Sequence, residues 1–76
     1  MKVKDHNYII AFGKHLRSLR KKNKLSQERL ANDADIPISQ VGRIERGEVN
    51  TTLSTMRALS KALKIHITEL FDFDND

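Results

Sequence analysis

Apolar residues recur along the chain at steps of three and four, the spacing of one face of a helix. The first such stripe consists of Ile9, Phe12, Leu16 and Leu19. It predicts an amphipathic helix that ends near Asn23, with lysine and arginine side chains on the opposite face.

A second, shorter helix is predicted from Ser26 to about Ala34. Ser26 is a favourable N-cap residue, and Leu25 and Leu30 have the spacing of a hydrophobic staple across the start of a helix. Leu30, Ala31 and Ala34 are its expected buried residues. The two alanines are small enough to let another helix approach closely.

The segment 35–37 interrupts the pattern, because a proline disfavours helical geometry in the residue before it and suits a helix start. A third helix follows Pro37 and ends before Gly47, with Val41 and Ile44 on its buried side. At about 100° of rotation per residue, the side opposite Val41 and Ile44 forms an outward face. This outward face consists of Ser39, Gly42, Arg43 and Arg46.

Two further helices complete the pattern. Thr52 is placed to cap a fourth helix that ends at Lys64, and Ile67 starts a last short one. The residues expected to face inward on the fourth helix are Leu53, Met56, Leu59, Ala62 and Leu63, and the last helix is indicated by Ile67, Leu70 and Phe71. We expect a frayed tail after them and no strand. The predicted fold is all-α: a compact domain of five short helices.

The composition narrows the class of protein. A chain of 76 residues with 38% apolar residues is the size of one domain. Without cysteine it has no disulfide or thiolate metal site, which fits a cytoplasmic location. No apolar run approaches the roughly 18–20 residues of a membrane span, so neither membrane insertion nor export is expected.

The net charge of +4 is unevenly distributed. Residues 1–24 contain eight Lys or Arg against one Asp, a net charge of +7, whereas residues 64–76 have a net charge of −3. A basic segment suits DNA or RNA, but it is also common in a soluble lysine-rich helix. Lys21, Lys22 and Lys24 therefore either contact phosphates or keep the domain soluble.

The chain shows no motif for catalysis or for binding a metal or nucleotide. His6, His15 and His66 are scattered, without the spacing of metal ligands. There is no nucleophile motif and no glycine-rich loop. We expect no enzymatic activity, no cofactor and no metal.

Two helices joined by a tight turn can place the second one in the major groove of DNA. There an arginine such as Arg43 can contact O6 and N7 of guanine in bidentate fashion. The alternative is that Arg43 and Arg46 are ordinary solvated charges of a surface helix.

The stretch LSQERLANDADIPISQVGRIERGE resembles the helix-turn-helix of the phage repressor and Cro family, also called the Xre family. Gln27, Ala31, Val41 and Ile44 match the motif positions of that family, and "ERG" at 45–47 matches its usual ending. The resemblance extends over 12–71 and implies a helix-turn-helix DNA-binding domain there. Residues 1–11 are then an N-terminal extension of the first helix, and residues 72–76 are an acidic tail.

The resemblance also implies roles for individual residues. An ion pair between Arg20 and Glu45 would tie the first helix to the third. The residues implied to contact base edges are Ile38, Ser39, Gln40 and Arg43. Those implied to contact phosphates are Gln27, Arg46, Asn50, Thr51 and Thr52.

Four residues depart from the usual pattern of the family. Asp35 replaces the glycine of the turn, although aspartate tolerates a left-handed conformation. Pro37 replaces the usual Ser or Thr cap, and Ile38 can only contact a thymine methyl group or pack. Gly42 either lets the helix backbone approach DNA closely or is simply tolerated there.

These expectations define a sequence-specific DNA-binding transcription regulator, most simply a repressor, with double-stranded DNA as its partner. One helix supplies few base contacts, so we expect a homodimer on a near-palindromic operator with half-sites roughly 34 Å apart. The candidate dimer surfaces are Ile67, Phe71 and Phe73, or Tyr8 and Ile10. The alternatives are a restriction-modification controller, an antitoxin with a toxin as protein partner, and a protein-binding adaptor.

Overall fold

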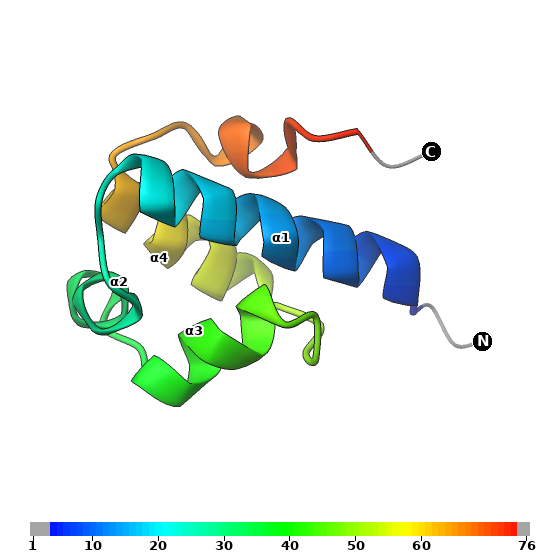
Figure 1. Cartoon of the computed structure of the whole chain (residues 1–76), viewed down its shortest axis with the longest axis horizontal. Helices are drawn as coiled ribbons and strands as arrows, with labels where there is room; N and C mark the ends of the chain where they lie inside the picture. Colours follow the sequence, from blue (N-terminus) through cyan, green and yellow to red (C-terminus); the bar gives the residue numbers. More distant parts are fainter. Residues whose placement is uncertain (1–3, 75–76) are drawn as a thin grey trace.

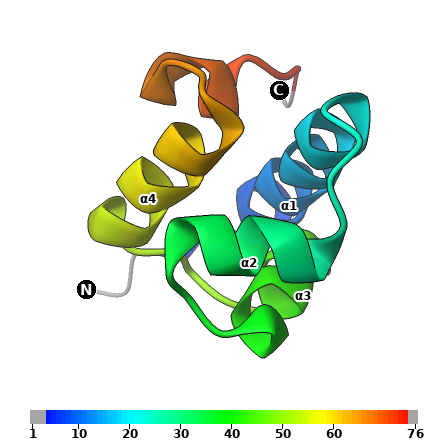
Figure 2. The same ribbon diagram turned by 90° about the vertical axis from the view of Figure 1, so that its left-hand side faces the viewer.

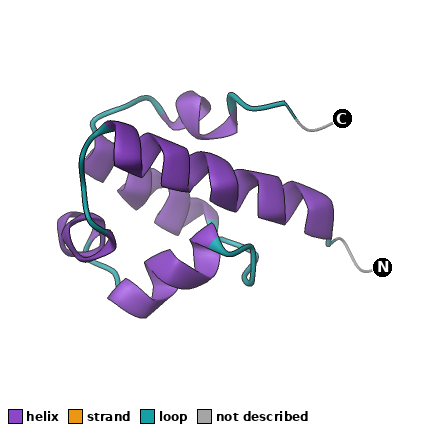
Figure 3. Ribbon diagram, in the orientation of Figure 1, coloured by secondary structure: helices purple, strands orange, loops and turns teal. Residues whose placement is uncertain are grey.

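The computed structural model describes residues 4–74 and contains no strand within them (Figure 3). Its elements are α1 His6–Lys22, α2 Gln27–Ala34, α3 Ile38–Glu45, α4 Leu53–Leu63 and the 3₁₀-helix η1 Ile67–Phe71. The predicted all-α class is confirmed. The prediction of five α-helices is wrong in one respect, because the last element is a 3₁₀-helix of five residues.

The long helix α1 runs across the molecule, with η1 on one side of it and the α2–α3 pair on the other (Figure 1). Figure 2 shows α2 lying across α3, with α4 beside them. Helix α3 contacts both α1 and α2, and α2 also contacts α4. The third helix is therefore held from two directions.

Within the described residues the core contains ten buried apolar residues, drawn from all five elements. They are Phe12, Leu16, Leu30, Ala31, Ala34, Val41, Ile44, Leu59, Leu63 and Leu70. All ten belong to the stripes expected from the sequence. Within residues 4–74 no helix is both long enough and apolar enough to cross a membrane.

Leu53 is an exception, because 72% of its surface is exposed and the expectation that it faces inward is wrong. The buried side of α4 is set by Leu59, Ser60 and Leu63. Leu53 is rotated roughly 70° away from that direction and lies in the first turn of α4. Phe71 of η1, a candidate dimer-surface residue, is 39% exposed.

Helix ends follow local side-chain chemistry. The hydroxyl of Ser26 accepts a hydrogen bond from the backbone N–H of Arg29 at 3.0 Å, and that of Thr52 accepts one from Thr55 at 3.2 Å. Asp5 does the same for Tyr8 at 3.0 Å, so α1 begins at His6, one turn before its apolar stripe. These caps satisfy N–H groups that have no partner inside a helix.

A glycine allows α1 to lie directly against α3. A Cβ atom added at Gly13 would overlap the carbonyl oxygen of Ile44 and lie 2.9 Å from that of Glu45. Any larger residue at position 13 must push the two helix backbones apart. Gly13 therefore fixes how closely α3 is held to the rest of the domain.

The C-terminal segment packs onto α1. The ring of Phe73 lies 5.1 Å from that of Tyr8 and 5.2 Å from that of His15, measured between centroids. Nε2 of His15 is 2.7 Å from the carbonyl oxygen of Glu69. The expectation of a frayed tail is wrong for Phe73, because its ring finds an aromatic surface on α1, and the last residues of that tail, 75–76, lie outside the described residues.

Candidate nucleic-acid interface

Helices α2 and α3 are joined by a tight turn that depends on one left-handed residue. Asp35 has φ 57° and ψ 46°, and the backbone N–H of Ile36 donates to the carbonyl of Ala31 at 3.0 Å. Pro37 precedes α3 with an extended backbone and no side-chain cap. Aspartate thus takes the conformation for which glycine is the usual residue, and α3 starts directly after the proline.

The inner side of α3 is held by a buried polar network. Arg20 of α1 donates from Nε to Oε2 of Glu45 at 2.7 Å and from Nη2 to Oε1 at 3.1 Å. Its Nη1 also donates to the carbonyl of Leu25 at 2.8 Å. Gln27 of α2 donates to Oε1 of Glu45 at 3.0 Å. One carboxylate therefore connects α1, α2 and α3.

The opposite side of α3 is open. Ser39 and Arg43 are exposed, and Ile38 keeps 49% of its surface accessible. Gln40 is half-buried and lies toward one edge. Within residues 4–74 the guanidinium of Arg43 donates no hydrogen bond to the protein, so its N–H groups are available to a partner.

Arg46 lies on the same side, in an ion pair with Glu48. Its Nε is 2.6 Å from Oε2 of Glu48, with side-chain exposures of 60% and 52%. The hydrogen bond from Arg46 lowers the pKa of the Glu48 carboxyl, and the same bond raises the pKa of Arg46. Arg43 also lies close enough to lower the pKa of Glu48 by its charge. Glu48 was not expected as part of this surface, although an acidic residue two positions after an arginine is a visible signal.

Gly42 belongs to the outward face by rotation but is buried. A Cβ atom added there would lie 2.9 Å from Nη1 of Arg46. The guanidinium of Arg46 therefore covers Gly42 on the outward face. The covering side chain comes from one turn further along the chain, which helical rotation alone does not predict.

Of the residues implied to contact phosphate, Arg46 lies on the outward side of α3, and the other four lie at two places around α3. Gln27 is half-buried at the start of α2, with its amide engaged by Glu45. Asn50, Thr51 and Thr52 follow α3, and the hydroxyl of Thr52 caps α4. These places are the N-terminal ends of α2 and α4, where backbone N–H groups favour an anion.

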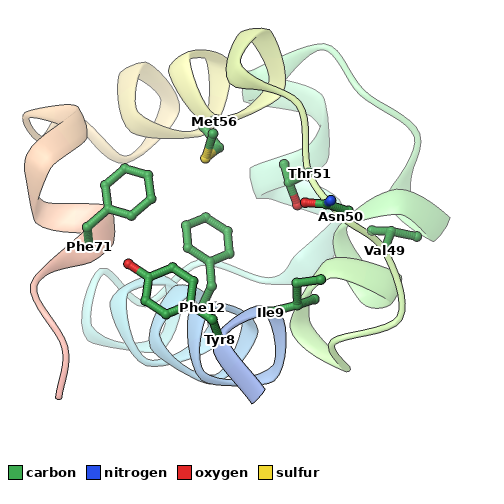
Figure 4. Close-up of a pocket in the computed structure, with 8 residues that line it drawn as sticks. All are labelled: Tyr8, Ile9, Phe12, Val49, Asn50, Thr51, Met56 and Phe71. Atoms are coloured by element: carbon green, nitrogen blue, oxygen red, sulfur yellow. The ribbon is translucent and has the colours of Figure 1, made fainter. Parts of the chain in front are cut away.

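The loop that carries Asn50 and Thr51 rests beside a small apolar hollow of about 150 Å³. Figure 4 shows side chains from α1, α4 and η1 around it, with Asn50 and Thr51 at one end. The hollow is lined by Tyr8, Ile9, Phe12, Val49, Asn50, Thr51, Met56 and Phe71. The loop position thus depends on the packing of α1 and η1 as well as on α3.

The helix-turn-helix family model matches residues 16–70, which include α2, α3 and the turn between them. The chain belongs to the helix-turn-helix family. Proteins of this family, which include a phage immunity repressor and a restriction-modification controller, are DNA-binding transcription regulators. The chain is therefore a DNA-binding regulator and not an enzyme. The resemblance found in the sequence is confirmed.

Two relatives and one solved structure are similar to this chain over most of its length. Control protein C.BamHI from Bacillus amyloliquefaciens is 36% identical over 69 residues, covering 90% of this chain and 85% of the relative. The immunity repressor of Bacillus phage phi105 is 36% identical, covering 76% of this chain and 40% of the repressor. The crystal structure of the restriction-modification controller C.AhdI from Aeromonas hydrophila matches with a TM-score of 0.82 and 43% identity, over 83% of this chain and 96% of that one.

Proposed function

We propose that this regulator controls transcription of a restriction-modification system by binding a near-palindromic operator as a homodimer, with α3 in the major groove. The observation that carries the proposal is the division of α3 into two sides. Glu45 fixes the inner side to α1 and α2, while Ser39 and Arg43 remain exposed on the other. The C.BamHI and C.AhdI proteins support the choice of a controller among the possible regulators.

The dimensions support insertion of α3 into DNA. A helix with its side chains is about 10–12 Å across, and the major groove of B-DNA is about 12 Å wide. Arg43 would contact guanine, Ser39 and Gln40 would contact other base edges, and Ile38 would meet a thymine methyl group. Gln27, Asn50, Thr51 and Thr52 would bind the phosphates on either side.

A homodimer follows from the small size of one such contact surface. Two copies related by a dyad would place their α3 helices in successive major grooves, about 10–10.5 base pairs apart. Tyr8, Ile10 and Phe71 each keep 39% of their surface exposed and are available for contact with a second copy. Analytical ultracentrifugation of the free chain and of its DNA complex measures this directly.

Selection of duplexes from a random pool by the full chain tests the proposal. We expect enriched sequences with two inverted half-sites at the spacing given above, and binding that weakens as salt rises. A protein-binding adaptor would enrich no sequence and would show little salt dependence on random DNA.

The restriction-modification assignment has its own test. In the genome that encodes the chain, the selected operator should lie upstream of genes for a restriction nuclease and a DNA methyltransferase. Operators found only beside other genes would contradict the controller role while leaving sequence-specific DNA binding intact.

A further inference from the structure

Arg46 occupies the centre of the outward face, although it follows the last residue of α3. Val41 and Ile44 define the buried direction of α3. At about 100° per residue, Ser39 and Arg46 both lie within about 10° of the opposite direction. The middle of the surface that faces away from the core is therefore formed by these two residues.

The side chain of Arg46 is directed back along the helix. Helical side chains tilt toward the N-terminus, and the guanidinium of Arg46 lies over Gly42, one turn earlier. A Cβ atom at position 42 would lie 2.9 Å from its Nη1 and 3.7 Å from its Cζ. Only glycine leaves this place open, and it brings the guanidinium toward the N-terminal half of α3, the half that contacts bases in helix-turn-helix proteins.

Glu48 changes what Arg46 can offer to DNA. Oε2 of Glu48 accepts from Nε at 2.6 Å, whereas the second contact, from Nη2 to Oε1, is long at 3.5 Å. The paired carboxylate offsets the positive charge, which weakens attraction to a phosphate. Within residues 4–74 it leaves both N–H groups of Nη1 and one of the two on Nη2 without a protein acceptor, and these form the fork that binds guanine.

We propose that Gly42 is a positioning residue that seats the guanidinium of Arg46 on the outward face, and that Arg46 contacts a base edge beside Arg43 instead of a phosphate. This inference rests on the proposed insertion of α3 into the major groove. It changes the role of Arg46 implied by family resemblance. It also gives Gly42 a function other than close approach of the backbone to DNA.

The test compares four full-length chains: the wild type, Gly42→Ala, Arg46→Ala and the double variant. Their probes are the duplex selected by the wild type and its single base-pair variants. Circular dichroism and thermal unfolding confirm that each chain is folded. Because the added Cβ at position 42 meets only the end of a flexible side chain, we expect Gly42→Ala to fold.

Arg46→Ala should lose about 5- to 150-fold in affinity for the selected duplex, and this loss should disappear on duplexes altered at one base pair of each half-site. Gly42→Ala should lose discrimination at that same base pair. The double variant should bind no more weakly than Arg46→Ala, because the glycine acts through the arginine.

Three results would overturn the inference. Equal loss by Arg46→Ala on every duplex would make Arg46 a phosphate contact. If Gly42→Ala still discriminates fully among the base-pair variants, Gly42 does not position Arg46. If Gly42→Ala loses the same affinity in the wild type and in Arg46→Ala, the backbone itself approaches DNA. A wild-type chain that selects no duplex would instead defeat the proposed function, and this inference with it.

Discussion

Two arginine–glutamate ion pairs lie at the C-terminal end of α3. They have the same chemistry, but they differ in burial and in their further hydrogen-bond partners. Arg20 and Glu45 have side-chain exposures of 10% and 3%, whereas Arg46 and Glu48 have 60% and 52%. The buried pair joins α1 to α3, and a hydrogen bond from Gln27 adds α2. Removing Glu45 would therefore leave the charge of Arg20 buried without a partner. The exposed pair is screened by water and contributes little to folding. The Arg20–Glu45 pair thus fixes α3 to the other helices, whereas the Arg46–Glu48 pair is part of the exposed surface of α3.

The largest expected effect is on the buried pair. Glu45→Ala should lower the free energy of unfolding by about 3–5 kcal/mol, because Arg20 is left buried without its partner. Urea denaturation measures the change, with Glu48→Ala as the matched control on the exposed pair. Equal midpoints for the two variants would show that burial does not distinguish the pairs.

The two glycines beside these pairs should respond in opposite directions. Gly13→Ala should cost about 1–3 kcal/mol, since the new Cβ meets the backbone of α3. In Gly42→Ala the new Cβ meets only the guanidinium of Arg46. This variant should be about 0.5–1 kcal/mol more stable, because alanine is more favourable than glycine inside a helix. Thermal unfolding of both variants checks this, and a more stable Gly13→Ala would mean that α1 and α3 are not in close contact.

The outward face should matter for binding and not for folding. Arg43→Ala should weaken binding to the selected duplex by about 1–3 kcal/mol and change affinity for random DNA much less. The matched control is Arg57→Ala, because Arg57 is an exposed arginine of α4 that lies near His66 and Glu69. Fluorescence anisotropy titrations measure both variants, and the same loss on both kinds of DNA would make Arg43 a phosphate contact.

The smallest expected effect is the loss of stability at acid pH when Glu48 becomes protonated. Because the hydrogen bond from Arg46 lowers the pKa of Glu48, the contribution of this pair to stability is present above the ordinary carboxyl pKa and is lost as pH falls through the lowered value. Wild type and Glu48→Gln should therefore differ slightly in unfolding midpoint at pH 7 and converge as the pH falls below the lowered pKa of Glu48. Thermal unfolding across this range measures the difference, which should not grow as the solution becomes more acidic.

Most of the fold could be predicted because periodic stripes and caps are local signals. Ser26 and Thr52 mark helix starts by bonds within three residues, and the buried stripe of α3 follows from Val41 and Ile44 alone. The type of the last helix could not be predicted from its apolar residues, because a stripe as short as Ile67–Phe71 fits both an α-helix and a 3₁₀-helix.

The parts that could not be predicted depend on contacts between elements. Gly13 gives no sign in the sequence that Ile44 lies against it, and the apolar spacing of α4 does not reveal that Leu53 is exposed. The covering of Gly42 depends on the rotamer of Arg46. The DNA contacts themselves stay predictions, because they depend on a partner that the sequence does not contain.

The separation of the two sides of α3 has a consequence for how such regulators diversify. Ile38, Ser39 and Arg43 are exposed, whereas the ties to the other helices come from Glu45 and the apolar residues on the inner side. Substitutions at these three positions can therefore accumulate at little cost in stability, since surface changes usually alter it by less than about 0.5 kcal/mol. Duplicated copies of one gene would be free to acquire separate operators, and an engineer could exchange the same three residues to redirect the domain to a new promoter.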